Sequence, residues 1–232
     1  MNDIYFKYRG RDSRAMGIEA SDFIFVGEAE PNVESFEVPG RSGTLTYWDG
    51  SYRNREIEAP SFLLSDGATR EIDKINEWLI SSQEYGKLML SHDPEHFYLA
   101  RAVRGIPEHI RADILTPFTV EFDALPQKYL KSGAREYAAG AKIYNPTKFT
   151  AFPIWKIHVE GTVQLTVGEN TAVISGAGGD IIIDTETGVA TAAGVSVSNK
   201  ISFENDLVLL PGVNEVSISG GTLRYIPRWW TI

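Results

Sequence analysis

The amino-acid sequence predicts a mostly β protein with two domains and a single clear α-helix. Three observations support this prediction: apolar and polar residues alternate with a period of two along much of the chain, glycines separate the alternating runs, and one segment has helical spacing. The 232 residues are enough for two domains of ordinary size. Hydrophobic residues make up 43% and charged residues 23%, as in a folded globular protein.

The first predicted element of note is a long hairpin between residues 40 and 55. Gly40, Gly43 and Gly50 permit the turns of such a hairpin. Aromatic and arginine side chains gather on it, and such side chains supply contact area and paired hydrogen bonds where subunits meet. The candidate subunit-interface residues are Arg41, Tyr47, Trp48, Tyr52, Arg53 and Arg55.

The predicted helix covers residues 70–82. Ile72, Ile75 and Leu79 recur at i, i+3 and i+7, whereas the charged residues between them face away. A helix with one apolar stripe buries that stripe on a sheet, and Gly86 marks its exit into a strand at residues 87–90. The N-terminal domain is therefore predicted to be a β-sheet with one covering helix.

Strand patterns dominate the rest of the chain. At residues 118–124, four apolar residues on one face alternate with three polar residues on the other, as expected of a half-buried antiparallel strand. The same alternation recurs at 155–160, 163–167 and 216–219. Gly188 and the pair Gly220–Gly221 mark turns between such runs. The last part of the chain is predicted to be an antiparallel β-sandwich.

A shift in composition toward proline and small residues follows residue 124 and indicates the connection between the two domains. We place the join near residues 145–152. The predicted domains are residues 1–147 and 148–232.

Composition excludes several classes of function. The absence of cysteine removes disulfides, thiol nucleophiles and cysteine-type zinc sites. No apolar run is long enough for a secretory leader or a membrane span, so we expect synthesis in a cytoplasm without membrane insertion. A net charge of −9 disfavours nucleic acid as a partner.

No catalytic, metal or cofactor site is predicted, and the chain is not expected to be an enzyme. His92 and His96 have the i, i+4 spacing of a zinc site, but Pro94 between them prevents one helical face from holding both. No serine lies in a nucleophile elbow. A glycan hydrolase with two carboxylates across a sandwich groove stays open as a weaker alternative.

Several short segments follow one another along the chain in the order and spacing seen in a known protein family. They are Tyr5–Gly10, Met16–Ile18, Val38–Gly43, the helix at 70–82, Asp93–Pro94, Phe97–Ala100, Phe118–Ala124, Asn145–Pro146, Ile183–Asp184 and Leu210–Asn214. Together they resemble the distal tail proteins of siphophages and the related tail components encoded by many Gram-positive phages and prophages.

The resemblance implies a structural virion protein at the tip of a long non-contractile tail, acting in host attachment. Its N-terminal domain would form a homohexameric hub ring that continues the tail tube, and its C-terminal domain would be a galectin-like β-sandwich. The implied partners are further copies of the chain, the tail tube protein, a tail-tip, tail-associated lysin or fibre protein, and a receptor-binding protein. The alternative function is a lectin-like carbohydrate-binding module of a phage or bacterial surface system, which self-association would distinguish.

Overall fold

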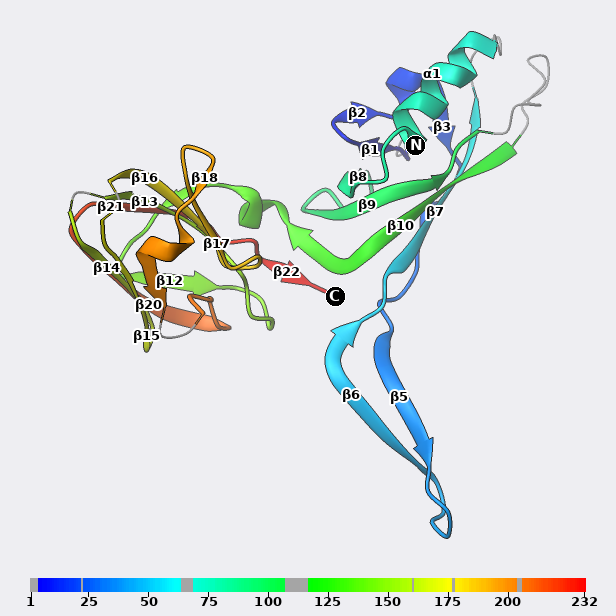
Figure 1. Cartoon of the computed structure of the whole chain (residues 1–232). Coiled ribbons are helices and arrows are strands. Elements are labelled where there is room, and N and C mark those ends of the chain that lie inside the picture. Colours follow the sequence, from blue (N-terminus) through cyan, green and yellow to red (C-terminus); the bar gives the residue numbers. More distant parts are fainter. Residues whose placement is uncertain are drawn as a thin grey trace. The chain divides into compact units, whose positions relative to one another are not determined.

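The computed structural model describes residues 4–21, 23–63, 69–106, 117–159, 161–176, 178–203 and 206–232 (Figure 1). The chain divides into two compact units, one of residues 1–128 with Ile232 and the other of residues 129–231. Strands predominate in both units, and the described residues contain one α-helix. The predicted fold class is confirmed.

The first unit is built on an antiparallel sheet with the strand order β2-β1-β8-β9-β10-β7-β3. Strand β4 also pairs with β7, beside β3 and β10, and β5 and β6 form a separate two-stranded sheet. The elements are β1 (Phe6–Tyr8), β2 (Arg11–Asp12), a 3-10 helix (Arg14–Met16), β3 (Ile18–Ala20), β4 (Phe25–Val26), β5 (Pro31–Glu37), β6 (Thr44–Tyr52), β7 (Arg55–Leu63), α1 (Thr69–Ile80), β8 (Gly86–Leu90), β9 (His96–Arg104) and β10 (Pro117–Leu130).

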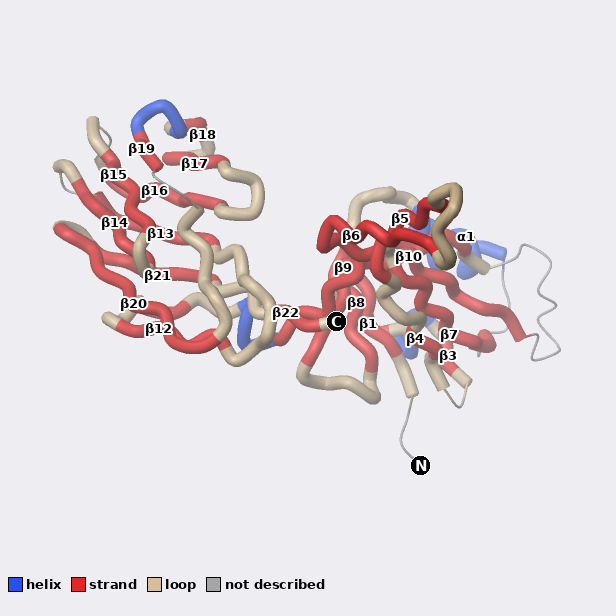
Figure 2. Tube along the Cα trace, turned by 90° about the horizontal axis from the view of Figure 1, so that it is seen from below, coloured by secondary structure: helices blue, strands red, loops and turns tan. Residues whose placement is uncertain are grey.

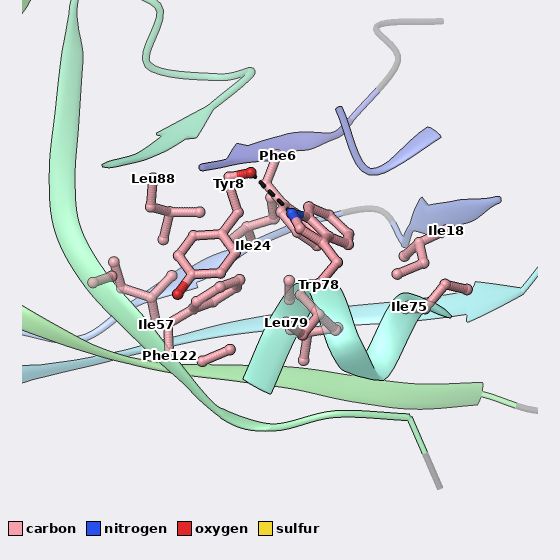
Figure 3. Packing of buried hydrophobic residues seen from close by; sticks show 14 of the residues in the cluster. Phe6, Tyr8, Ile18, Ile24, Ile57, Ile75, Trp78, Leu79, Leu88 and Phe122 are labelled. Carbon is pink, nitrogen blue, oxygen red and sulfur yellow. Dashed lines mark hydrogen bonds between the residues drawn. The ribbon is translucent and has the colours of Figure 1, made fainter. Parts of the chain in front are cut away.

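Helix α1 lies where the sequence predicts a helix and buries the predicted stripe. Ile72, Ile75 and Leu79 are each less than 5% exposed and join a core of strand residues. The indole Nε1 of Trp78 donates a hydrogen bond of 3.1 Å to the backbone oxygen of Tyr8 (Figure 3). The helix is thus fixed to the sheet by apolar packing and by one buried polar contact.

The second unit contains two antiparallel sheets, with the orders β11-β21-β13-β16-β17-β18 and β12-β20-β14-β15-β19 (Figure 2). Apolar residues that alternate along the strands of both sheets form one buried cluster, as a β-sandwich requires. The strands of these sheets are β11 (Tyr137–Ala138), β12 (Lys142–Asn145), β13 (Ile154–Val159), β14 (Val163–Val167), β15 (Asn170–Ile174), β16 (Gly179–Asp184), β17 (Val189–Ala192), β18 (Val195–Ser196), β19 (Ile201–Phe203), β20 (Gly212–Ser219) and β21 (Thr222–Ile226), with 3-10 helices at Lys131–Ala134 and Ser198–Lys200. The short strand β22 (Trp230–Thr231) lies outside these two sheets.

The two predicted glycine turns have different roles in this sandwich. Gly188 closes a hairpin between the paired strands β16 and β17, with a φ of 67°. Gly220 and Gly221 link β20 to β21, which lie in different sheets, so this turn carries the chain across the sandwich. A Cβ atom on Gly221 would lie 2.0 Å from the backbone oxygen of His158, which explains why no side chain is accommodated there.

The compact units divide between Lys128 and Tyr129. The predicted join near residues 145–152 therefore falls inside the second unit, where β11 pairs with β21 and β12 pairs with β20. Whether each unit folds alone stays a prediction. No helix among the described residues is both long and apolar enough to cross a membrane.

Candidate interaction surface

The hairpin formed by β5 and β6 is exposed along its whole length. Every residue from Glu30 to Ser51 is exposed, and Tyr52 is half-buried. In Figure 1 the hairpin extends away from the sheet of the first unit to which it is joined. An isolated two-stranded hairpin is marginally stable in water, so a hairpin of this length is expected to gain stability from a partner.

The register of the hairpin decides which side chains share a face. Phe36 lies opposite Leu45, and Glu34 lies opposite Tyr47, which places Phe36, Leu45 and Tyr47 on one face. Val33 lies opposite Trp48 on the other face. All of these apolar side chains are exposed, and Tyr47 reaches 60%. Both faces therefore offer apolar area to a partner.

A bulge at the base of the hairpin fixes the position of Trp48. Three residues of β6, Asp49 to Ser51, stand opposite Asn32 alone, and Gly50 has a φ of 88°. The Asp49 carboxylate accepts hydrogen bonds from the backbone N–H and hydroxyl of Ser51, at 2.8 and 2.6 Å. The Trp48 indole donates to the Ser51 oxygen at 2.7 Å. The indole is thus held in a defined orientation although it is exposed.

Five of the six predicted interface residues lie on this hairpin or at its end. Arg41 is in the turn, Tyr47 and Trp48 are on opposite faces, and Tyr52 packs edge-on against Trp48 with ring centroids 5.4 Å apart. Arg53 is exposed, and its backbone N–H donates to the Glu30 oxygen at 2.8 Å. Their role in an interface stays a proposal.

Arg55, the sixth residue, lies in a different environment. It is 6% exposed and begins β7, in the same phase as the buried residues Ile57 and Ala59. Its Nη2 donates to the Pro126 oxygen, and its guanidinium lies 5.6 Å from the centre of the Tyr98 ring. Burial lowers the pKa of Arg55. The chain's own fold covers most of this side chain, so Arg55 is not part of the exposed surface of the hairpin.

Arg55 lines a cavity of about 680 Å³ at the root of the hairpin. The lining residues are Val26, Gly27, Glu28, Ala29, Arg55, His92, Asp93, Tyr98, Lys128 and Ile232. The Asp93 carboxylate is already occupied, because it binds Lys128 Nζ and lies 2.7 Å from His96 Nδ1. Burial raises the pKa of Asp93, but these hydrogen bonds and charges outweigh burial and lower it.

His92 and His96 lie at the connection between β8 and β9, where the chain turns at Asp93 and Pro94. Within the described ranges, no group of three or more histidine, aspartate or glutamate residues converges on a metal position.

The two tryptophans near the C-terminus differ in environment: Trp229 is 5% exposed, whereas Trp230 stacks on Phe149 with ring centroids 4.3 Å apart. Trp229 therefore belongs to the buried cluster of the second unit.

The sequence pattern missed the apolar residues of β5 and its turn. Val33 and Phe36 of β5 lie opposite Trp48 and Leu45 of β6, and Val38 follows the end of β5; all three are exposed. The sequence feature that indicates them is the turn Pro39–Gly43, which has short runs of alternating apolar and polar residues on both sides, as in a hairpin. Reading both sides of that turn as one hairpin would have found them.

No protein-family model matches the chain, and no curated protein matches it by sequence. Among solved structures, the crystal structure of the SPP1 protein Dit is similar, with a TM-score of 0.72 and 15% sequence identity. That structure is described as a paradigm of the hub adsorption apparatus in phages that infect Gram-positive bacteria, and the match covers 96% of this chain and 97% of Dit. The resemblance inferred from the order of the segments is confirmed at the level of fold: this chain shares the fold of a siphophage distal tail hub protein.

Proposed function

We propose that this chain is a structural component of a phage tail hub, in which copies form a hexameric ring at the distal end of a long tail. The ring would join the tail tube to the tail-tip or adsorption proteins and would have no catalytic role. The observation that carries the proposal is the fold shared with SPP1 Dit over 96% of the chain. At 15% identity this is a likeness of fold, so the function requires a direct test.

The exposed hairpin supports an assembly role. It offers apolar side chains on both faces, and Trp48 is held by a hydrogen bond while 47% exposed. Aromatic residues held in place are the side chains that most often dominate protein interfaces. A hairpin that contacts a different surface of the next copy makes a head-to-tail interface, which closes into a ring when its rotation divides a full turn evenly.

Light scattering after size exclusion tests the proposal. We expect about six times the monomer mass or, where the tail is needed to hold the ring, a concentration-dependent equilibrium between monomer and hexamer. Trp48→Ala should weaken association by about 1–3 kcal/mol per interface. The melting of the second unit should not change, because Trp48 belongs to the first unit.

Tyr144→Ala is the matched control. Tyr144 is an aromatic residue of β12 in the second unit and is 66% exposed. Its replacement should leave the association constant unchanged. A chain that stays monomeric at high concentration and also fails to assemble on isolated tail tubes would refute the ring, and a Trp48→Ala chain that associates like wild type would refute this interface.

A further inference from the structure

A buried guanidinium without a carboxylate partner is a costly feature. Arg55 is 6% exposed and makes no ion pair with any described residue. Its Nε is buried without a hydrogen-bond acceptor among the described residues. The Pro126 oxygen and the Tyr98 ring contact the guanidinium, but neither carries a formal charge. These contacts offset only part of the cost of removing the cation from water.

The missing partner is an anion, and the cavity at the root of the hairpin is where it would enter. Arg55 lines this cavity. The two side-chain carboxylates of the lining do not serve Arg55: Asp93 is held by Lys128 and His96, and Glu28 is exposed and makes no ion pair with Arg55. Of the two lining cations Arg55 and Lys128, Arg55 is therefore the one left without a counter-charge.

We propose that this cavity is a carboxylate-binding site, in which Arg55 pairs with an Asp or Glu side chain of a second copy of the chain. A guanidinium presents paired N–H donors that match the two oxygens of a carboxylate. The chain has 31 acidic residues and a net charge of −9, so each copy offers many carboxylates to its neighbour.

The position of the cavity favours a second copy as the source. Residues 26–29, which line the cavity, lead directly into β5, and Arg55 follows β6 after two residues. The cavity is thus continuous with the hairpin. This step rests on the proposed ring: if the hairpin contacts the next copy, the surface of that copy also passes over the mouth of the cavity.

Sedimentation of the full chain tests the pairing. We expect Arg55→Met to weaken self-association roughly ten- to hundredfold. The melting temperature of the dilute, monomeric chain should stay the same or rise, because the substitution removes an uncompensated buried charge. Arg55→Lys keeps the charge without the paired donors and should recover association only in part. Arg135→Met removes an equivalent charge from an exposed site in the second unit and should change neither quantity.

Unchanged association in Arg55→Met overturns the proposal, as does a lower melting temperature of the dilute variant, which would show a purely structural role. Glu28→Gln tests the alternative that Arg55 pairs with Glu28 of the same chain. A lower melting temperature of this dilute variant would identify Glu28 as the partner and would also overturn the proposal.

A second experiment tests the carboxylate site independently of the proposed ring. Sodium acetate is compared with sodium chloride at equal ionic strength on the dilute chain. We expect acetate to raise the melting temperature of wild type and not of Arg55→Met, because a small carboxylate then occupies the site. If wild type associates neither in solution nor on isolated tail tubes, the ring and the second copy as carboxylate source are both refuted, but an acetate effect that depends on Arg55 still supports the carboxylate site. If acetate has no effect that depends on Arg55, the carboxylate site itself is refuted.

Discussion

At the scale of single residues, Asp184 and Arg228 form the best-defined ion pair of the second unit. Two hydrogen bonds of 2.6 and 2.7 Å join the guanidinium to both carboxylate oxygens, and each side chain is about one-quarter exposed. The hydrogen bond from Arg228 is the main cause that lowers the pKa of Asp184, and it outweighs burial. The pair connects the end of β16 to the segment before β22.

This pair predicts a pH dependence of stability. Because the pKa of Asp184 is lower in the folded state than in the unfolded chain, its contribution is present above the unfolded value of about 4 and is lost as the pH falls through the folded value. Asp184→Asn should lower the free energy of unfolding of the second unit at pH 7 by about 1–3 kcal/mol. It should also reduce the loss of stability below pH 4.

Urea unfolding of the second unit between pH 2 and pH 7 would measure this effect, with Asp206→Asn as the control at an exposed carboxylate. Parallel pH profiles for wild type and Asp184→Asn would contradict the prediction.

At the scale of elements, the chain crosses between the two sheets of the second unit at Gly220–Gly221. Gly221 has a φ of 78°, and a Cβ atom there would meet the His158 backbone oxygen at 2.0 Å. Gly221→Ala should therefore cost about 2–4 kcal/mol, because left-handed strain adds to a collision with rigid backbone. Gly188→Ala is the matched control: its φ is 67°, but the space around it is open, so we expect a loss of about 1 kcal/mol. Thermal unfolding of the two variants gives the comparison, and equal losses would contradict the argument.

An element could be predicted from the sequence only where its apolar pattern was long enough to show a period. The helix at Thr69–Ile80 and the strand through residues 118–124 have several apolar residues in one phase, so their periods were clear. β11 and β12 have only two and four residues, too few for their sequence pattern to distinguish a strand from a loop. The pairing of β20 and β21 with different sheets depends on long-range contacts, which no local period encodes.

The candidate site was predicted in part for the same reason. Tyr47 and Trp48 stood out as aromatic residues beside turn glycines, and both are exposed. Arg55 is near them in sequence, which is why the prediction includes it, but it shares the buried phase of Ile57 and Ala59 in β7. That phase was a signal of burial. An arginine in an apolar phase is a rare arrangement, which made the cluster of arginines the simpler interpretation.

At the scale of the whole molecule, the division into units depends on residues that composition alone assigned to a linker. Residues 129–147 contain Pro146 and several small residues, yet they pack into the second unit. Ile143 is 3% exposed in its core. A Cβ atom on Gly133 would lie 2.3 Å from the Trp229 nitrogen, which shows how closely this segment approaches the end of the same unit.

Asn145 ties the segment to the sandwich. Its side-chain amide is 1% exposed and donates hydrogen bonds to the Phe149 and Leu209 oxygens, at 2.9 and 3.0 Å. Its side-chain oxygen accepts from the backbone and hydroxyl of Thr147, at 2.9 and 2.8 Å. Removing Asn145 would leave the Leu209 oxygen without this donor, and removing β12 would open one edge of β20.

The last prediction compares two fragments of the chain. A fragment of residues 129–232 should unfold cooperatively, because it retains both sheets and the buried cluster of the second unit. A fragment of residues 148–232 loses β11, β12, the buried Ile143 and the Asn145 hydrogen bonds, and should be less stable by more than about 3 kcal/mol. Since domains are stable by only about 5–15 kcal/mol, a loss of that size lowers the melting temperature markedly or abolishes the transition. Calorimetry of both fragments decides between the two boundaries: equal melting temperatures would show that residues 129–147 contribute nothing to the unit and would restore the join near residue 148.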